Sequence, residues 1–541
     1  MMIYIIDNNL YLYNSDSYLA TANHLKKISN DNDKVKLLLK EYNTDLYESM
    51  RSLTINSNVI NMYDYYQDIT KLKYKNAQLY EHPILINNLD FDSQAIIQST
   101  AELNNGGGAY DVVLHNQLIA KINVYPITFI NQEFNRVKEV IYYDKYNHAL
   151  KQDCYDFRGF LSSTMFFDEN GNTIMIDYYN RKGDVKIEKY FNNGQLVNIC
   201  LYENRQILSF NNEDEMFQHF LDNMVNKSIQ NENVNVITFN HTMYNFISNI
   251  NYQNTNYHLK RFCALDDIQY SYQENNSRKQ NINAPLNAVT DELFKLPSNR
   301  INGVVVATHQ QRDDLLHHFN NHPPIPIYNA NYVVSSQVLD IHVAVPIKKR
   351  KRGTFVCMTS FLPNQSDLLT LISAVKIAKQ SYPNIHVTIY GFDFGLSANY
   401  HVGDADFYEF VKNRVLSNGL EKEITFQDYL TNADSVMNSC QGYINIDNYD
   451  TQSFGTLLAL EHGNLVIAHN ENYGFDNFIT NNYNGYLLPK HDQNLLAQAM
   501  LKAVSLSNDK WQTMVNNTYQ KSKQYQQDIY QKQWQFIYNH K

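Results

Sequence analysis

Residues 449–468, YDTQSFGTLLALEHGNLVIA, decide the fold class of this chain. A loop of small and polar residues leads into an apolar helix, and the helix leads into a buried strand that ends in LVIA. This order of elements is typical of a nucleotide site in an α/β protein, where the loop lies at the carboxyl edge of a parallel sheet. Such a site needs charged residues, and this stretch offers few.

Strands and helices alternate in the same way at both ends of the chain. The first strand is MIYIID and a helical pattern follows it; the alternation returns after residue 213 and starts again with GTFVCMTS. This pattern predicts an α/β fold with two Rossmann-like domains. We expect the domains to span residues 1–60 plus 213–345 and residues 346–515, with a C-terminal amphipathic helix over 516–541 that packs back across them.

Residues 61–212 have a different texture, with short aromatic and β-branched runs between turn signals. Gly171, Gly183 and Gly194 lie 11 or 12 residues apart, each after a polar residue at a hairpin-like turn. The spacing predicts a β-meander inserted into the first α/β domain. The basic run KKRKR at 348–352 precedes the second domain, and we expect a solvated connector there.

Composition excludes several classes of protein. The net charge of −10 and the pI near 6.0 argue against nucleic-acid binding. The five cysteines are scattered, without a C-x-x-C pair, which predicts a reduced cytoplasmic protein with neither disulfides nor a zinc site. We expect no signal peptide and no transmembrane segment. The 42 tyrosines reflect either codon bias or a surface that binds carbohydrate or protein.

The C-terminal half resembles the donor domain of retaining glycosyltransferases of family 4. The resemblance rests on IYGFDFG, on LSNGLEKEITFQDYLTNADSVMNSCQGYINID and on SFGTLLALEHGNLVIAHNENYGFDNFITNNYNGYLLP. The inserted segment, with YDFRGFLS and YYNRKGDVKIEKYFN, resembles the bacterial branch that contains poly(glycerol-phosphate) α-glucosyltransferases and the GtfA/GtfB-type subunits that glycosylate serine-rich adhesins. The resemblance implies a GT-B fold, with the acceptor bound by the first domain.

The family places an Arg and a Lys beneath the leaving diphosphate, because negative charge develops there as the glycosidic bond breaks. In this chain the matching segment reads TSFLPNQS. Phe361 takes the position of the Arg, and Gln365 lies near that of the Lys. Neither side chain can neutralise a diphosphate, and the next basic residue is Lys376, a full helix later.

The family also holds the donor sugar and ribose with two carboxylates in an E-x7-E motif. Alignment from the strand Val466–Ala468 gives Asp450 and Leu458, whereas alignment from Phe454-Gly455 gives Gln452 and Leu460. Both registers put a leucine at the ribose position. Glu461 is the one candidate replacement. It lies one or three residues from the ribose position, so on a helix its side chain points about 60° to 100° away from that of the motif carboxylate.

The family's first domain carries a His after a strand, and the matching neighbourhood ends in Cys263-Ala264-Leu265-Asp266 instead. His258 precedes this strand and His309 lies on a later element. His241 follows another strand, where a satisfied, partly buried His is the simpler interpretation. His317, His318 and His322 lack a closed ligand set, so we expect no metal there.

Three interpretations follow from these substitutions. The first is a non-catalytic GtfB-like subunit, without a cofactor, that stabilises a homologous active glycosyltransferase and helps to bind an acceptor polypeptide before export. The alternative is an active retaining enzyme that transfers glucose or GlcNAc from a UDP-sugar to teichoic acid or protein. A weaker one is a polysaccharide-binding regulator. The candidate donor-site residues for an active enzyme are Gly391, Asp450, Glu461, Tyr473 and Gly474.

Overall fold

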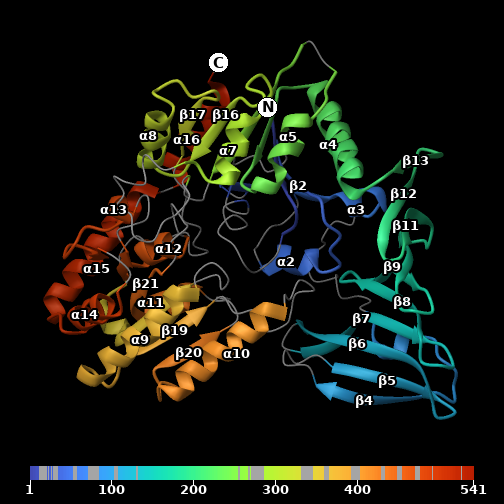
Figure 1. Ribbon diagram of the computed structural model, residues 1–541, viewed down its shortest axis with the longest axis horizontal. Helices are drawn as coiled ribbons and strands as arrows, with labels where there is room; N and C mark the ends of the chain where they lie inside the picture. The colour runs from blue at the N-terminus through green and yellow to red at the C-terminus, as the bar shows by residue number, and fades with distance from the viewer. Residues whose placement is uncertain are drawn as a thin grey trace.

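Within the part of the chain that the structure describes, two parallel sheets and one antiparallel sheet form the framework (Figure 1). The structure is a computed structural model. It describes residues 1–10, 21, 24–25, 27–28, 34–52, 58–70, 84–102, 108–129, 132–253, 256–265, 269, 285–330, 345–358, 365–390, 402–427, 433–446, 454–469, 475–489, 492–525 and 527–540.

The N-terminal sheet has seven parallel strands in the order β17-β16-β15-β14-β1-β2-β3. Every side chain of β1 is buried, as expected for a strand covered on both faces. The chain leaves this sheet after β3 and returns at β14, with the antiparallel sheet in between. The strands are β1 Met2–Asp7, β2 Val35–Leu39, β3 Val59–Asn61, β14 Val234–Thr238, β15 Leu259–Leu265, β16 Gly303–Val306 and β17 Ile327–Asn329.

The antiparallel sheet is a meander in which ten strands pair in sequence order, β4 to β13. Gly171, Gly183 and Gly194 lie in its turns with φ of +81°, +85° and +74°, the left-handed region that favours glycine. The strands are β4 Ile96–Glu102, β5 Gly108–Leu114, β6 Gln117–Phe129, β7 Gln132–Tyr143, β8 Ala149–Asp156, β9 Phe160–Phe167, β10 Thr173–Tyr179, β11 Val185–Asn192, β12 Gln195–Glu203 and β13 Gln206–Phe210.

One hydrophobic core joins the inner face of this meander to the first domain. Tyr178 and Ile187, opposite each other on β10 and β11, share a core with Phe217 and Phe220 of helix α4. Figure 1 shows α3 and α4 on this side of the meander. The helices of the first domain are α2 Leu46–Ser52, α3 Met62–Tyr66, α4 Glu213–Ile229, α5 Tyr244–Asn249, α7 Ala288–Lys295 and α8 His309–His318, with the 3-10 turns η3 Ile86–Asn88 and η4 His241–Met243.

A buried ion cluster forms a second link between the meander and the first domain. Arg158, in the turn between β8 and β9, donates to the Oδ1 of Asp156 at 2.6 Å and to the Oδ1 of Asp64 on α3 at 3.0 Å. The rings of Tyr47 and Phe160 lie 4.1 and 5.5 Å from its guanidinium carbon. Because all three charges are buried, loss of one partner would leave an uncompensated charge and loosen the meander.

The C-terminal sheet has six parallel strands in the order β20-β19-β18-β21-β22-β23. Its strands are β18 Lys351–Met358, β19 His386–Tyr390, β20 Ile424–Gln427, β21 Cys440–Ile444, β22 Leu465–His469 and β23 Gly485–Leu488. Its helices are α9 Gln365–Ser381, α10 Val402–Ser417, α11 Ala433–Ser439, α12 Phe454–His462, α13 Phe475–Phe478, α14 Gln493–Val504 and α15 Asn508–Ser522, with the 3-10 turns η5 Ile347–Lys349 and η6 Lys523–Tyr525. The predicted α/β class is confirmed.

The C-terminal helix α16, Gln527–Asn539, returns to the first domain. Trp534 and Tyr538 belong to the core beneath β1 and β2, whereas Trp511 of α15 belongs to the core of the second domain. The fully buried His24 links its Nδ1 to the Tyr530 hydroxyl at 2.6 Å and its Nε2 to the Tyr538 hydroxyl at 2.8 Å. The chain therefore ties its two domains together at its end. No helix among the described residues has the length and apolarity to cross a membrane.

Candidate functional site

The candidate donor site is the carboxyl edge of the C-terminal sheet. The first strand, β18, lies beside β21, and the connections from these two strands run to opposite sides of the sheet. Ligands of open α/β sheets bind at such a switch point. The loops that follow most strands here lie outside the described residues, so the described part of the edge consists of strand ends and of helix α12.

Both leucines at the predicted ribose position belong to the apolar core. Leu458 is 1% exposed and Leu460 is 0% exposed, and they pack in one cluster with Tyr443, Val466 and Phe475. A sugar hydroxyl has nothing to bond on these side chains. The leucines therefore stabilise the sheet, whichever of the two alignment registers is correct.

Gly455, at the second position of α12, is required by packing. A Cβ atom placed there would lie 2.1 Å from the hydroxyl oxygen of Tyr443 on β21, far closer than van der Waals contact. The glycine lets the first turn of α12 lie against this tyrosine, so the glycine of the SFG stretch has a structural role here.

The polar groups at this edge are uncharged or satisfied within the protein. Asn445, directly after β21, donates from its Nδ2 to the hydroxyl of Thr456 on α12 at 3.3 Å. His469 ends β22 and is 2% exposed. Among the last residues of the six strands, all of them described, there is no Lys or Arg; they are Met358, Tyr390, Gln427, Ile444, His469 and Leu488.

The basic residues nearest in sequence are used for structure. Arg350 is 6% exposed and donates to the carbonyl oxygens of Met437 and Cys440 at 3.3 and 3.2 Å, and burial lowers the pKa of its guanidinium to about 10. In the run for which the sequence predicts a solvated connector, Lys348, Lys349 and Lys351 are exposed, whereas Arg350 is buried and the run enters strand β18. Arg352 donates to two carbonyl oxygens at the end of α14, and Lys376 donates to the Oδ1 of Asn418 at 2.8 Å.

Glu461 lies half-buried on α12, close to the first domain. Burial lowers the pKa of Lys27, and the Glu461 carboxylate opposes this lowering. Burial also raises the pKa of Tyr519 on α15, and Glu461 adds to that rise. The carboxylate therefore lies where the two domains meet the C-terminal helices.

The remaining predicted donor-site residues fall largely outside the described part of the chain. Gln365 is the first residue of α9, and its side chain is outside that part. The others lie wholly outside it: Phe361, Gly391, Asp450, Gln452, Tyr473 and Gly474.

The carboxyl edge of the N-terminal sheet carries a polar network that the sequence interpretation missed. Asp7 ends β1 and is fully buried; its Oδ1 accepts from the Asn8 backbone and from the Asn240 side chain at 2.8 Å each. Its Oδ2 accepts from the Thr21 hydroxyl at 2.9 Å. Burial raises the pKa of this carboxyl to about 6. The sequence signal that could have indicated this network is the Asp at the end of the apolar run MIYIID.

Side-chain amides and a hydroxyl surround Asp7. Asn8 donates to the Thr242 hydroxyl at 2.9 Å, and the Thr242 hydroxyl and the Asn240 Oδ1 lie within hydrogen-bonding distance at 2.9 Å. Asn43 donates to the Oδ1 of Asn9 at 2.9 Å. Such side chains both donate and accept hydrogen bonds, and here they bond to one another.

The histidines singled out in the sequence are dispersed. His241 opens η4 after β14 and is exposed, so the expectation that it is partly buried is wrong. His258 precedes β15 and His309 begins α8. His317 and His318 end α8, and the His318 ring packs on Phe319 at 5.0 Å. No group of three potential metal ligands occurs within the described ranges.

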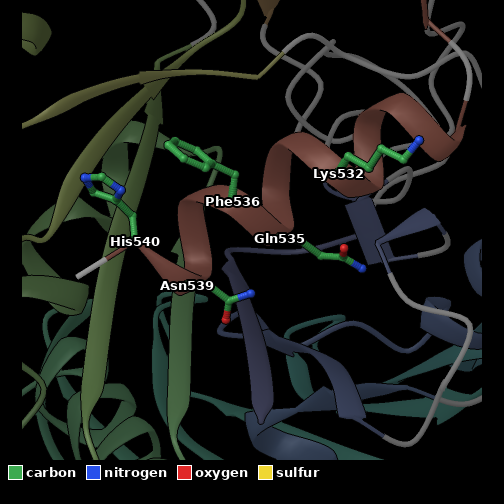
Figure 2. Close-up of a pocket in the computed structure, with 5 residues that line it drawn as sticks. All are labelled: Lys532, Gln535, Phe536, Asn539 and His540. Atoms are coloured by element: carbon green, nitrogen blue, oxygen red, sulfur yellow. The ribbon is translucent and has the colours of Figure 1, made fainter.

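A shallow pocket of about 570 Å³ lies on the C-terminal helix (Figure 2). Its described lining comes from α16 and the residue directly after it: Lys532, Gln535, Phe536, Asn539 and His540. Because α16 packs on the N-terminal sheet, this pocket is distinct from the carboxyl edge of the C-terminal sheet.

Comparison with known structures decides the fold. GtfA, the pneumococcal O-GlcNAc transferase in complex with UDP and GlcNAc, is similar over 100% of this chain and 99% of its own, with a TM-score of 0.75 and 15% identity. TarM of S. aureus, in complex with fondaparinux, α-GlcNAc-glycerol and UDP, is similar over 100% of both chains with a TM-score of 0.72 and 16% identity. The chain has the GT-B fold. A chain of a GtfA/B complex is also similar, over 99% of both chains, with a TM-score of 0.65 and 16% identity.

Two family matches lie within this GT-B chain. Residues 344–521 match glycosyl transferases group 1, and residues 111–211 match the GtfB middle domain. The second match falls on the inserted meander. The resemblance inferred from the sequence, to GT-B glycosyltransferases of family 4 with a GtfB-type insertion, is therefore confirmed.

Two curated relatives match parts of the GT-B chain. The poly(ribitol-phosphate) α-N-acetylglucosaminyltransferase of Staphylococcus aureus (strain COL) is 23% identical over 209 residues, 38% of each chain. The poly(glycerol-phosphate) α-glucosyltransferase of Bacillus subtilis (strain 168) is 21% identical over 197 residues, 36% of this chain and 26% of the relative. The matches span less than half the length of either relative.

Proposed function

We propose that this chain is a non-catalytic, GtfB-like subunit. It stabilises a homologous active glycosyltransferase and helps to bind the acceptor polypeptide during O-glycosylation, of GlcNAc type, of a cell-wall or adhesin protein. The observation that carries the proposal is the burial of Leu458 and Leu460, 1% and 0% exposed, in one apolar cluster. Either alignment register puts one of them at the ribose position, where active relatives carry a carboxylate.

Missing positive charge supports the same proposal. Retaining transfer needs a cation beside the leaving diphosphate, because that group gains negative charge in the transition state. Phe361 and Gln365 stand where the family has Arg and Lys. Among the described basic residues near this segment in sequence, Arg350, Arg352 and Lys376 bond to carbonyl and amide oxygens of their own domain. Lys351 is exposed, but it begins β18 and so lies at the end of the strand away from the carboxyl edge.

The inserted meander supports an interaction with a partner subunit. Within the described ranges its first and last strands, β4 and β13, each pair with one neighbour, and they expose Ile96 and Ile207 by 65% and 62%. Open edges with apolar side chains favour pairing with another chain. The GtfB middle-domain match covers most of this sheet. In this proposal the complex works in the cytoplasm, before the acceptor is exported.

The alternative, an active retaining enzyme, is favoured by the names of the two curated relatives, both glycosyltransferases. It requires Asp450 and Glu461 to act as the donor carboxylates and other groups to supply the positive charge. The position of Glu461 near Lys27 and Tyr519 favours a role at the domain junction instead.

Reconstitution tests the proposal. A homologous glycosyltransferase with intact Arg, Lys and E-x7-E residues is co-expressed with this chain, and transfer of GlcNAc from UDP-GlcNAc to a serine-rich acceptor is measured by mass spectrometry. We expect co-purification, no transfer by this chain alone, and faster transfer when both subunits are present.

Charge-removal variants provide the control. In the reconstituted pair, Asp450→Asn and Glu461→Gln in this chain are expected to leave transfer unchanged, whereas removal of either motif carboxylate in the homologue abolishes it. Transfer by this chain alone, lost in either variant, would establish the alternative.

A further inference from the structure

The outer face of the meander carries two carboxylates directly opposite each other. Asp177 on β10 and Glu188 on β11 are cross-strand partners, so they share a face. Their neighbours in sequence, Tyr178 and Ile187, are also opposite each other and lie in the core on the inner face. Because side chains alternate along a strand, the two carboxylates belong to the outer face. Figure 1 shows helices α3 and α4 on the inner side only.

Three tyrosines bond to these carboxylates. Tyr190 donates to the Oε2 of Glu188 at 3.0 Å, and Tyr202 donates to the same oxygen. Tyr179 donates to the Oδ2 of Asp177 at 3.4 Å. We call these five residues the outer-face cluster. They come from strands β10, β11 and β12, so the sheet fixes their spacing.

Two like charges in this arrangement destabilise a sheet unless a cation lies between them. Within the described residues, neither Asp177 nor Glu188 forms an ion pair with a Lys or Arg. Asp177 is 8% exposed, and its buried Oδ1 accepts no hydrogen bond within the described residues. In the same cross-strand row, Asp153 bonds to Lys151 at 2.8 Å and to Thr164 at 2.8 Å. In this row, therefore, the charge of Asp153 is balanced by a lysine, whereas the charges of Asp177 and Glu188 are not balanced by a described Lys or Arg.

The same protein shows which side chain such a cluster accommodates. Arg158 lies between the carboxylates of Asp64 and Asp156, with the rings of Tyr47 and Phe160 over its guanidinium. Two carboxylates and flanking aromatic rings suit a guanidinium, which is planar and has five N–H donors. The carboxylates accept paired hydrogen bonds and the rings stack on its face. The outer-face cluster repeats these components without an internal arginine.

We infer that the outer-face cluster is a docking site for an arginine side chain of a partner protein. A guanidinium would bridge the carboxylates of Asp177 and Glu188 and stack on a tyrosine ring. An uncharged sugar would satisfy hydrogen bonds but would leave both negative charges in place, so charge complementarity favours the arginine. The inference does not depend on whether the donor site is active.

A small ligand tests the inference on the full chain. Saturation-transfer difference NMR is recorded with N-acetyl-arginine amide, N-acetyl-lysine amide and methyl α-GlcNAc at millimolar concentrations. We expect the arginine amide to bind best, and Asp177→Asn and Glu188→Gln each to weaken it about tenfold or more. Glu169→Gln, which removes one charge from an exposed turn of the same sheet, is the matched control and should leave binding unchanged.

Thermal unfolding separates this role from a structural one. Removal of one of two repelling charges should raise the unfolding midpoint of the isolated chain in Asp177→Asn and in Glu188→Gln. A lower midpoint would show that the carboxylates are needed for folding and would overturn the inference. Equal binding by wild type and both variants, or saturation by the glycoside in place of the arginine amide, would also overturn it.

Discussion

The carboxyl edges of the two Rossmann-like sheets have similar topology and opposite chemistry. In the first domain the edge holds a buried carboxyl, Asp7, with the amides of Asn8 and Asn240 around it. In the second domain the two candidate ribose positions on α12 are occupied by the buried Leu458 and Leu460. The fold depends on the apolar interior of each sheet, so a few residues at an edge can lose their polar groups while the sheet remains intact.

This difference lies in how the described residues of each edge are held. Polar groups that stay at a buried edge must be satisfied, and Asp7 makes three hydrogen bonds within the first domain. In the described part of the second edge, Gly455 lies against Tyr443 and the neighbouring side chains are packed in an apolar core. We therefore expect substitutions at the second edge to change stability through packing, and substitutions at the first edge to act through charge.

The largest effect is expected from Leu460→Glu. A carboxylate at a position that is 0% exposed and surrounded by apolar side chains should cost about 5 kcal/mol or more, enough to unfold the second domain. Chemical denaturation followed by circular dichroism measures the loss. Leu460→Met, which conserves volume, is the control and should cost less than about 1.5 kcal/mol. A stable Leu460→Glu protein would mean that this position faces a solvated site.

Low pH should release the helix that joins the two domains. Burial lowers the pKa of His24 to about 3, from about 6.5 when unfolded. Protonation of His24 therefore favours the unfolded state. The contribution of neutral His24 to the free energy of unfolding is fully present above pH 6.5, and about 4 kcal/mol of it is lost as the pH falls toward 3. Native-state hydrogen exchange in α16 should rise in this window. A His24→Gln variant should show a flatter pH dependence, and an identical profile would contradict the assignment.

Gly455→Ala should cost about 2–3 kcal/mol, because the added methyl group meets the Tyr443 hydroxyl. The double variant with Tyr443→Phe removes the clashing oxygen. In a double-mutant cycle the cost of Gly455→Ala should then fall by more than about 1 kcal/mol. If the free-energy changes of the two substitutions were simply additive, the close approach of Gly455 to the Tyr443 hydroxyl would not affect stability.

The smallest effect is expected at the first edge. Burial raises the pKa of Asp7 to about 6, from 3.8. The folded state therefore favours the protonated form of Asp7. The contribution of Asp7 to the free energy of unfolding is fully present below about pH 4 and is lost as the pH rises through 6. Asp7→Asn should stabilise the protein by about 1–2 kcal/mol at pH 8 and by less at pH 5, since Thr21 can accept from the new amide. Denaturation at both pH values measures it, and a destabilised variant at pH 8 would contradict the burial argument.

The sequence predicts the framework of the fold well, for physical reasons. The apolar runs of β1 and β22 and the glycine turns at 171, 183 and 194 are local signals, and the structure has strands and hairpins at each. The proposed loss of the donor motif rests on residue types alone, because Leu458 and Leu460 cannot act as carboxylates, and it stays a prediction.

Features that depend on contacts between distant segments could not be predicted. Arg350 looks like part of a solvated run, but carbonyl oxygens more than 80 residues away surround it. The pairing of Asp177 with Glu188 depends on strand register, which a shift of one residue would reverse. The hydrogen bonds of Asp7 to Thr21 and Asn240 likewise appear only when the chain is folded.

Calorimetric titration of the isolated, full-length chain with UDP-GlcNAc and UDP-glucose tests the central claim most directly. A homologous glycosyltransferase with an intact donor site serves as the positive control under the same conditions. If the second edge has become a packing surface, neither nucleotide sugar will give measurable heat of binding with this chain. Saturable binding in the micromolar range would contradict that claim and would identify the chain as a donor-binding glycosyltransferase.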